Sequence, residues 1–177
     1  AVLDDGRVFT WGANTIGQLG DDARIAQSVP VRVKDLTDVI EVAAGSEHVL
    51  ALKRDGSVWA WGANGSGQLG DGSFKASRVP VPIGLTGIAR VRAGGNQSFA
   101  ISSRRAIYSF GEASDGQLGL GDAISTDIGV PTAIARSVTD AASGDRTALL
   151  LGSNGLVSSA GANESGSLGD GGTTARK

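Results

Sequence analysis

The chain repeats itself with a period of about fifty residues, and this constrains its fold more than any other feature. The segment Gly6–Asn14 returns as Gly56–Asn64, and weaker copies occupy Arg105–Gly111 and Gly155–Asn163. One glycine of this motif recurs at intervals of 50, 49 and 50 residues, at positions 12, 62, 111 and 161. Periods of this length are typical of solenoids, propellers and arrays, in which each unit packs on its neighbours.

Further motifs follow in a fixed order within each unit. Gly-Gln-Leu-Gly begins at Gly17, Gly67 and Gly116, and its fourth copy is Gly-Ser-Leu-Gly at Gly166. Val-Pro comes next in the first three units, and a corner ending in glycine comes later, at positions 45, 94 and 144. The 28 glycines of the chain, about twice the usual share, are largely these repeated positions rather than a sign of flexibility.

Each unit is predicted to form four short strands. In the second unit these are Val39–Ala44, His48–Lys53, Ser57–Ala63 and Val79–Ile83. The third strand alternates large and small residues, and the prolines of the fourth suit an edge strand that needs fewer ladder donors. Four-stranded antiparallel units at this period predict an all-β fold, a β-propeller.

The turn between the second and third strands carries Asp55-Gly56 in the second unit. This pair predicts a type I′ hairpin, in which both central residues have positive φ. The third unit has Arg104-Arg105 instead. Because a non-glycine residue in left-handed geometry costs roughly 1–2 kcal/mol, we expect a different turn there.

The motif set resembles the repeat of the regulator of chromosome condensation family over essentially the whole chain. The matching residues of the second unit are Trp61–Asn64, Gly67–Gly70 and Pro80, and the corner Ala93-Gly94 follows in the third unit. The resemblance implies a propeller, typically of seven blades. It also implies a protein-binding function, since members bind small GTPases, chromatin components and, in bacteria, a β-lactamase.

The length corresponds to about 3.5 repeats, so an incomplete ring is expected. We predict a single partial propeller domain, 1–177, with repeat units of approximately 1–38, 39–87, 88–136 and 137–177. Its blades should have three, four, four and three strands. This is interpreted as an arc of a longer propeller; a genuine open arc and a ring assembled from several chains are the alternatives.

Composition excludes several classes of function. A chain without cysteine has no disulfide, thiolate metal site or cysteine nucleophile. A net charge of −2 gives no bulk attraction to nucleic acid or to an anionic membrane, so neither partner is expected. No signal peptide or transmembrane segment is visible in the chain as given, and the compartment stays undetermined.

Residues that look chemical have simpler structural explanations. Gly65–Gly70 matches a dinucleotide fingerprint, but a further loop follows it where that fingerprint requires a helix. The single histidine, His48, lacks a recognisable nucleophile and is predicted to form a structural hydrogen bond. Aspartates that follow the Gly-Gln-Leu-Gly loops are predicted to cap turns rather than bind metal; they are Asp21, Asp71, Asp122 and Asp170. We therefore predict no cofactor, metal site or catalytic residue.

Charge is unevenly distributed along the chain. Residues 61–110 contain one acidic and six basic residues, whereas 1–60 contain nine and six and 111–177 contain eight and four. Glu41, Arg90 and Asp140 occupy the same position on three successive inner strands. We hypothesise that Arg90 lies between the two carboxylates in an ion-pair ladder that ties adjacent blades together.

The sequence favours a non-catalytic protein-interaction scaffold whose partner is another protein. Phe74, Lys75 and Arg78 form one candidate contact surface, because Phe74 places an aromatic ring in an otherwise polar loop. Arg104 and Arg105 form another at the opposite end of the blades. A solvated charged surface is the simpler interpretation of the basic residues.

Two other functions stay open. One is a guanine-nucleotide exchange factor for a Ran-type GTPase, although that activity in the family relies on a protruding insertion that no unit here contains. The other is a structural repeat of a large bacterial surface or secreted protein. Incomplete blades would also allow self-association through their exposed edges.

Overall fold

A computed structural model describes residues 1–121, 126–134 and 137–176. Within these ranges the chain forms thirteen β-strands. The same ranges contain no helix of the length and apolarity needed to cross a bilayer. The prediction of an all-β fold is confirmed.

The strands form four antiparallel sheets that follow one another along the chain. The first sheet pairs β1 (Phe9–Gly12) with β2 (Gln27–Arg32). The second has the order β3 (Val39–Ala44), β4 (His48–Lys53), β5 (Val58–Gly62) and β6 (Ser77–Pro82). The third contains β7 (Ile88–Gly94), β8 (Gln97–Ser102), β9 (Ile107–Gly111) and β10 (Ile128–Ile134). The fourth contains β11 (Val138–Ser143), β12 (Thr147–Gly152) and β13 (Val157–Gly161).

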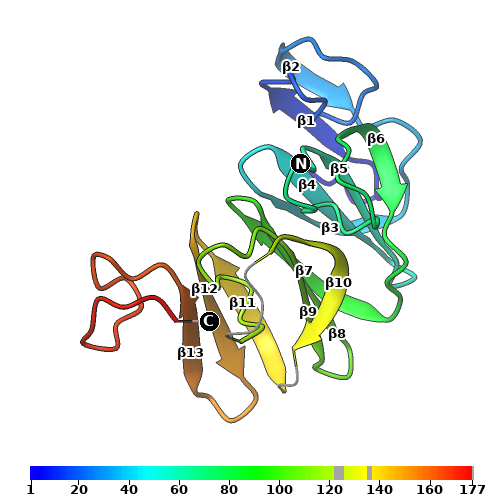
Figure 1. Cartoon of the computed structure of the whole chain (residues 1–177). Helices are drawn as coiled ribbons and strands as arrows, with labels where there is room; N and C mark the ends of the chain where they lie inside the picture. Colours follow the sequence, from blue (N-terminus) through cyan, green and yellow to red (C-terminus); the bar gives the residue numbers. More distant parts are fainter. Residues whose placement is uncertain (122–125, 135–136, 177) are drawn as a thin grey trace.

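Figure 1 shows these sheets as successive blades of an open arc, with the first sheet in blue at one end and the fourth in orange and brown at the other. The ring is not closed, so the predicted incomplete propeller is confirmed. The first blade departs from the predicted three strands. Beside β1, the residues before it form only an isolated bridge between Val2 and Val8.

The hairpin turn differs from the predicted type. Gly56 has a φ of 81°, but Asp55 is not in the positive-φ region. The Gly56 N–H donates to the Lys53 carbonyl at 2.9 Å, and the Lys53 N–H donates to the Ser57 carbonyl. This is a type I turn followed by one left-handed residue in a bulge. The type I′ prediction is wrong, because a glycine after an aspartate suits both turns.

The third unit forms the same turn with arginine, so the expectation of a different turn is also wrong. Arg105 has a φ of 65°, and its N–H donates to the Ser102 carbonyl at 2.8 Å. The Ser102 hydroxyl accepts from the Ala106 N–H at 3.1 Å, replacing the aspartate that accepts from the equivalent N–H in the second unit. The Arg105 carbonyl accepts from Val138 of the next blade, which holds the strained residue in place.

Aromatic side chains that pack directly against glycines join successive blades. Trp61 is fully buried, and its Nε1 donates to the Gln18 carbonyl of the preceding blade at 3.0 Å. A Cβ at Gly20 would lie 2.8 Å from this Nε1, and a Cβ at Gly70 would lie 2.7 Å from the ring of Phe110. The last glycine of Gly-Gln-Leu-Gly is therefore the residue on which an aromatic ring from the next blade packs.

A buried side-chain hydrogen bond of His48 joins the second and third blades. Its Nε2 lies 2.8 Å from the Ser98 hydroxyl, which itself donates to the Gln68 carbonyl at 2.7 Å. Since Ser98 uses its proton on that carbonyl, His48 Nε2 is the donor in the first contact. Burial lowers the pKa of His48 from 6.5 to about 4.

His48 should make stability depend on pH between about 6.5 and 4. The unfolded chain takes up the proton first as pH falls, so the free energy of unfolding decreases across this window, by about 2 kcal/mol between pH 7 and pH 4.5. His48→Gln, which copies the equivalent Gln97, should remove this dependence. Urea unfolding of both proteins at the two pH values measures it, and an equal loss in the variant would contradict the assignment.

The contribution of ring-on-glycine packing to stability can be tested with a matched pair of substitutions. Gly70→Ala and Gly169→Ala both place a side chain at positive φ (71° and 69°), but only Gly70 faces a ring, since a Cβ at Gly169 meets nothing within 4 Å. Gly169→Ala should cost about 1 kcal/mol of unfolding free energy from backbone strain. Gly70→Ala should cost about 2 kcal/mol more because of overpacking. Equal losses in chemical denaturation would show that the ring contact contributes nothing.

Candidate protein-interaction surfaces

A buried asparagine fixes the loop that carries Phe74 and Lys75. Asn64 is 1% exposed, and its Oδ1 accepts from the Leu69 N–H at 2.9 Å. Its Nδ2 donates to Asp71 Oδ1 at 3.1 Å and to the Lys75 carbonyl at 3.2 Å. One side chain therefore ties both halves of the loop together, and the loop backbone is held without packing of its outer side chains.

Two other units use the same asparagine. Asn14 and Asn163 are fully buried and donate to Asp21 and Asp170. These aspartates also cap their own turns, as Asp71 does by accepting from the Ser73 N–H at 2.9 Å. In the described parts of the chain no three histidine or acidic side chains gather as a metal site.

The third unit replaces this polar pair with an apolar one. Ala113 stands at the asparagine position and Leu120 directly follows the motif where the other units have aspartate. Both belong to, or pack on, the apolar cluster of the third and fourth blades. Asp122, which the sequence analysis aligned with the other aspartates, lies outside the described residues.

Phe74 and Lys75 lie at the surface of this fixed loop. Phe74 is 53% exposed, with one ring edge against Gly129 of the third blade, where a Cβ would come within 3.2 Å. The ring also lines a hollow of about 410 Å³ together with Ile16 and Asn96. Lys75 is exposed and makes no ion pair with any described residue.

Arg78 contributes to a blade interface. Its guanidinium lies 3.3 Å from Asp22 of the first blade, and its carbonyl accepts from the Asp22 N–H at 3.1 Å. Gly17 also packs against it, since a Cβ there would lie 2.8 Å from the Arg78 Cα. Asp22 accepts a hydrogen bond from Lys34, which lowers the pKa of its carboxyl group. Arg78 is therefore engaged with the first blade, unlike Phe74 and Lys75.

Arg104 and Arg105 are exposed at the opposite end of the blades, in the hairpin between β8 and β9. Neither side chain forms an ion pair within the ranges that the structure describes. The two predicted basic surfaces are therefore separate, because consecutive turns of an antiparallel blade lie at alternate ends.

An ion-pair ladder does connect the inner strands, but Arg92 is its central cation. Arg92 Nη1 lies 2.6 Å from Glu41 Oε1, and its Nη2 lies 2.8 Å from Asp140 Oδ1. Arg90 lies 3.7 Å from Asp140 Oδ2. Residues two apart on a strand share a face, so both arginines contact Asp140, but only Arg92 also pairs with Glu41 among the described contacts.

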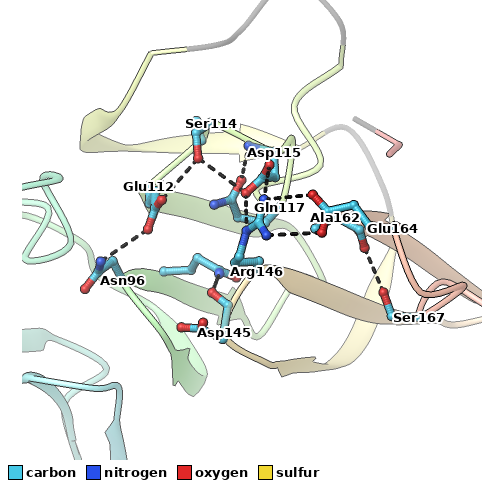
Figure 2. Close-up of polar contacts among 12 residues, drawn as sticks. Asn96, Glu112, Ser114, Asp115, Gln117, Asp145, Arg146, Ala162, Glu164 and Ser167 are labelled. Atoms are coloured by element: carbon cyan, nitrogen blue, oxygen red, sulfur yellow. Dashed lines mark hydrogen bonds and ion pairs between the residues drawn. The ribbon is translucent and has the colours of Figure 1, made fainter. Parts of the chain in front are cut away.

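Arg146 was not singled out by sequence reasoning, although its lone basic charge among acidic neighbours was visible. Figure 2 shows it between Asp115 and Glu164. It contacts Asp115 through two nitrogens, at 2.7 and 2.8 Å, and Glu164 at 3.2 Å. The hydrogen bond from Arg146 lowers the pKa of Asp115.

Arg146 leaves a buried glutamine, Gln117, without an acceptor for its side-chain N–H group. Arg146 occupies the position that Asn96 has in the third blade, where Asn96 Oδ1 accepts from Gln68 Nε2 at 3.1 Å. An arginine offers no acceptor. The equivalent Gln117 Nε2 is buried without a hydrogen-bond partner.

The ladder predicts unequal effects for the two arginines. Arg92→Leu should lower the free energy of unfolding by about 1 kcal/mol, because it removes short contacts with two blades, whereas Arg90→Leu should change it by less than about 0.5 kcal/mol. Chemical denaturation of both variants measures the difference. A larger loss for Arg90→Leu would reverse the assignment.

The blades and their motifs define this protein as an incomplete β-propeller of repeat type. The family model of the regulator of chromosome condensation (RCC1) repeat matches residues 5–52, 55–101 and 106–151, and a second model with the same description matches 39–68. The chain belongs to this repeat family.

Solved structures agree with this fold. Yeast RCC1 (Prp20), in a complex with Kap60, is 23% identical, with a TM-score of 0.87 over 97% of this chain and 43% of its own length. Human WBSCR16 is 25% identical, with a TM-score of 0.83 over 98% of this chain and 46% of its own. Prp20p of Saccharomyces cerevisiae, from a study of its binding to Gsp1p and histones, is 23% identical with a TM-score of 0.87, over 97% of this chain and 45% of its own. The chain thus spans less than half the length of these proteins.

Proposed function

We propose that the chain is a non-catalytic protein-interaction scaffold, and that the loop bearing Phe74 and Lys75 contacts the partner. The observation that carries this proposal is an exposed aromatic ring beside a lysine that forms no ion pair with any residue the structure describes, on a loop whose backbone Asn64 fixes. Exposed aromatic residues are typical anchors of protein interfaces.

The physical properties of the loop support this assignment. A backbone that is already ordered loses little conformational entropy when a partner binds. Phe74 supplies apolar area, and Lys75 favours a partner with an acidic residue at the edge of the contact. Relatives of the same fold also bind proteins, since yeast Prp20 was crystallised with Kap60 and studied with Gsp1p and histones.

The remaining predicted contact residues have different roles in this proposal. Arg78 stabilises the contact between the first two blades through Asp22. Arg104 and Arg105 offer a second pair of exposed cations, at the other end of the blades. Since the pair contains no aromatic side chain, it serves as a control for the Phe74–Lys75 surface.

Removing both side chains from the loop should weaken partner binding. The variant Phe74→Ala with Lys75→Ala should bind a protein captured by the wild-type chain at least about tenfold more weakly in titration calorimetry. Its melting temperature should stay close to that of the wild type, because neither side chain is buried. The control variant Arg104→Ala should keep the wild-type affinity.

Two outcomes would count against the proposal. An unchanged affinity of the double variant would remove the loop from the interface. Faster release of GDP from a Ran-type GTPase on addition of the chain would favour nucleotide exchange, the competing function, over a non-catalytic scaffold.

A further inference from the structure

The hollow that Phe74 lines also contains an acidic residue, Glu47, in the turn between β3 and β4. Among the described residues that line this hollow, Glu47 is the only one that carries a charge. It is exposed and forms no ion pair with any residue the structure describes. The volume of about 410 Å³ lies in the range of clefts that bind small ligands.

The fourth blade shows how a charge at the equivalent position is paired. Arg146 lies in the turn between β11 and β12, as Glu47 does between β3 and β4. Its guanidinium pairs with Asp115 of the preceding blade and with Glu164 of its own blade. A charged side chain in this turn is therefore within reach of two loop positions, one on each blade.

The two corresponding loop positions beside Glu47 carry no charge. Ile16 of the first blade stands where Asp115 stands, directly before the first glycine of Gly-Gln-Leu-Gly. Gly65 of the second blade stands where Glu164 stands, two residues before that glycine. The second blade thus has an acid, without a cation from the loops, at the position where the fourth blade has an ion-paired arginine.

The rest of the hollow suits the planar end of an arginine side chain. Phe74 is 53% exposed, and Ile16 supplies apolar surface on the opposite blade. A guanidinium group stacks on aromatic rings and also pairs with a carboxylate through two N–H groups, whereas a lysine ammonium is a point charge. Arginine is therefore the side chain that can use both Phe74 and Glu47.

We propose that this hollow binds an arginine side chain of the partner protein, an inference that rests on the proposed function of the Phe74–Lys75 surface. The guanidinium pairs with Glu47, and the side chain packs against Phe74 and Ile16. Lys75, on the same loop as Phe74, then favours an acidic residue next to that arginine.

The probe is N-acetylarginine amide, titrated into the isotope-labelled full chain and followed by NMR spectroscopy. The main-chain amide signals of Glu47 and Ser66 should shift along a saturable curve with a dissociation constant below about 20 mM. N-acetylcitrulline amide, which has nearly the same shape without the charge, should bind at least about fivefold more weakly.

Two charge-removing variants provide a matched comparison. Glu47→Gln should weaken binding of the arginine probe at least about fivefold, because it removes the charge and keeps the shape. Asp35→Asn removes the same charge from an exposed residue that precedes β3, whereas Glu47 follows this strand. Asparagine tolerates the positive φ of this position, 49°, and the variant should keep the wild-type affinity. Equal binding of both probes, equal losses in both variants, or no saturable shift up to about 100 mM would overturn the proposal.

A second measurement tests whether the arginine belongs to the partner. Glu47→Gln should bind the protein captured by the wild-type chain at least about fivefold more weakly, and a wild-type affinity would overturn the assignment. If Phe74→Ala with Lys75→Ala weakens this binding and Glu47→Gln does not, only the arginine assignment is wrong. If the double variant keeps full affinity, the proposed function of the loop is wrong, and the probe titration still decides whether the hollow binds arginine.

Discussion

The structure depends on contacts between successive blades, because a single small antiparallel sheet buries too little apolar surface to be stable alone. The ring-on-glycine contact shows this dependence most directly. Trp61 covers Gly20 and Phe110 covers Gly70, and neither glycine tolerates a Cβ without displacing the ring. At the fourth blade Ala160 takes the place of the ring, 4.0 Å from a Cβ built at Gly119. The motif therefore belongs to the interface between two units rather than to one unit.

The family repeat and the blade are out of step along the chain. The first match, residues 5–52, begins before β1, the third strand of one blade, and ends in β4, the second strand of the next. It therefore contains the loop of one blade and the first two strands of the next. The ring that covers Gly20 belongs to Trp61, which falls in the second match, 55–101, so the ring-on-glycine contact joins one sequence repeat to the next.

The sequence predicted the strands and blades well because alternation and repeated turns encode them locally. The bounds of β3 and β4 agree with prediction to the residue. The errors arise where one pattern allows two geometries. Asp55-Gly56 suits two turn types, and Arg90 and Arg92 share a strand face, so only the backbone φ values and the distances between blades distinguish them. The apolar pair of the third unit was missed because its aspartate, Asp122, lies two residues beyond Leu120.

The buried asparagines explain how one backbone can present different chemistry in each blade. In three units the asparagine Nδ2 donates to a main-chain carbonyl eleven residues later, at Ile25, Lys75 and Thr174. The hydrogen bond uses only the main chain of these residues, so the position is fixed while its side chain is unconstrained. The side chain at this position is apolar in the first blade (Ile25), cationic in the second (Lys75) and carries a hydroxyl group in the fourth (Thr174). The shape of the loop does not depend on these side chains. They can therefore differ between blades and contact molecules outside the protein.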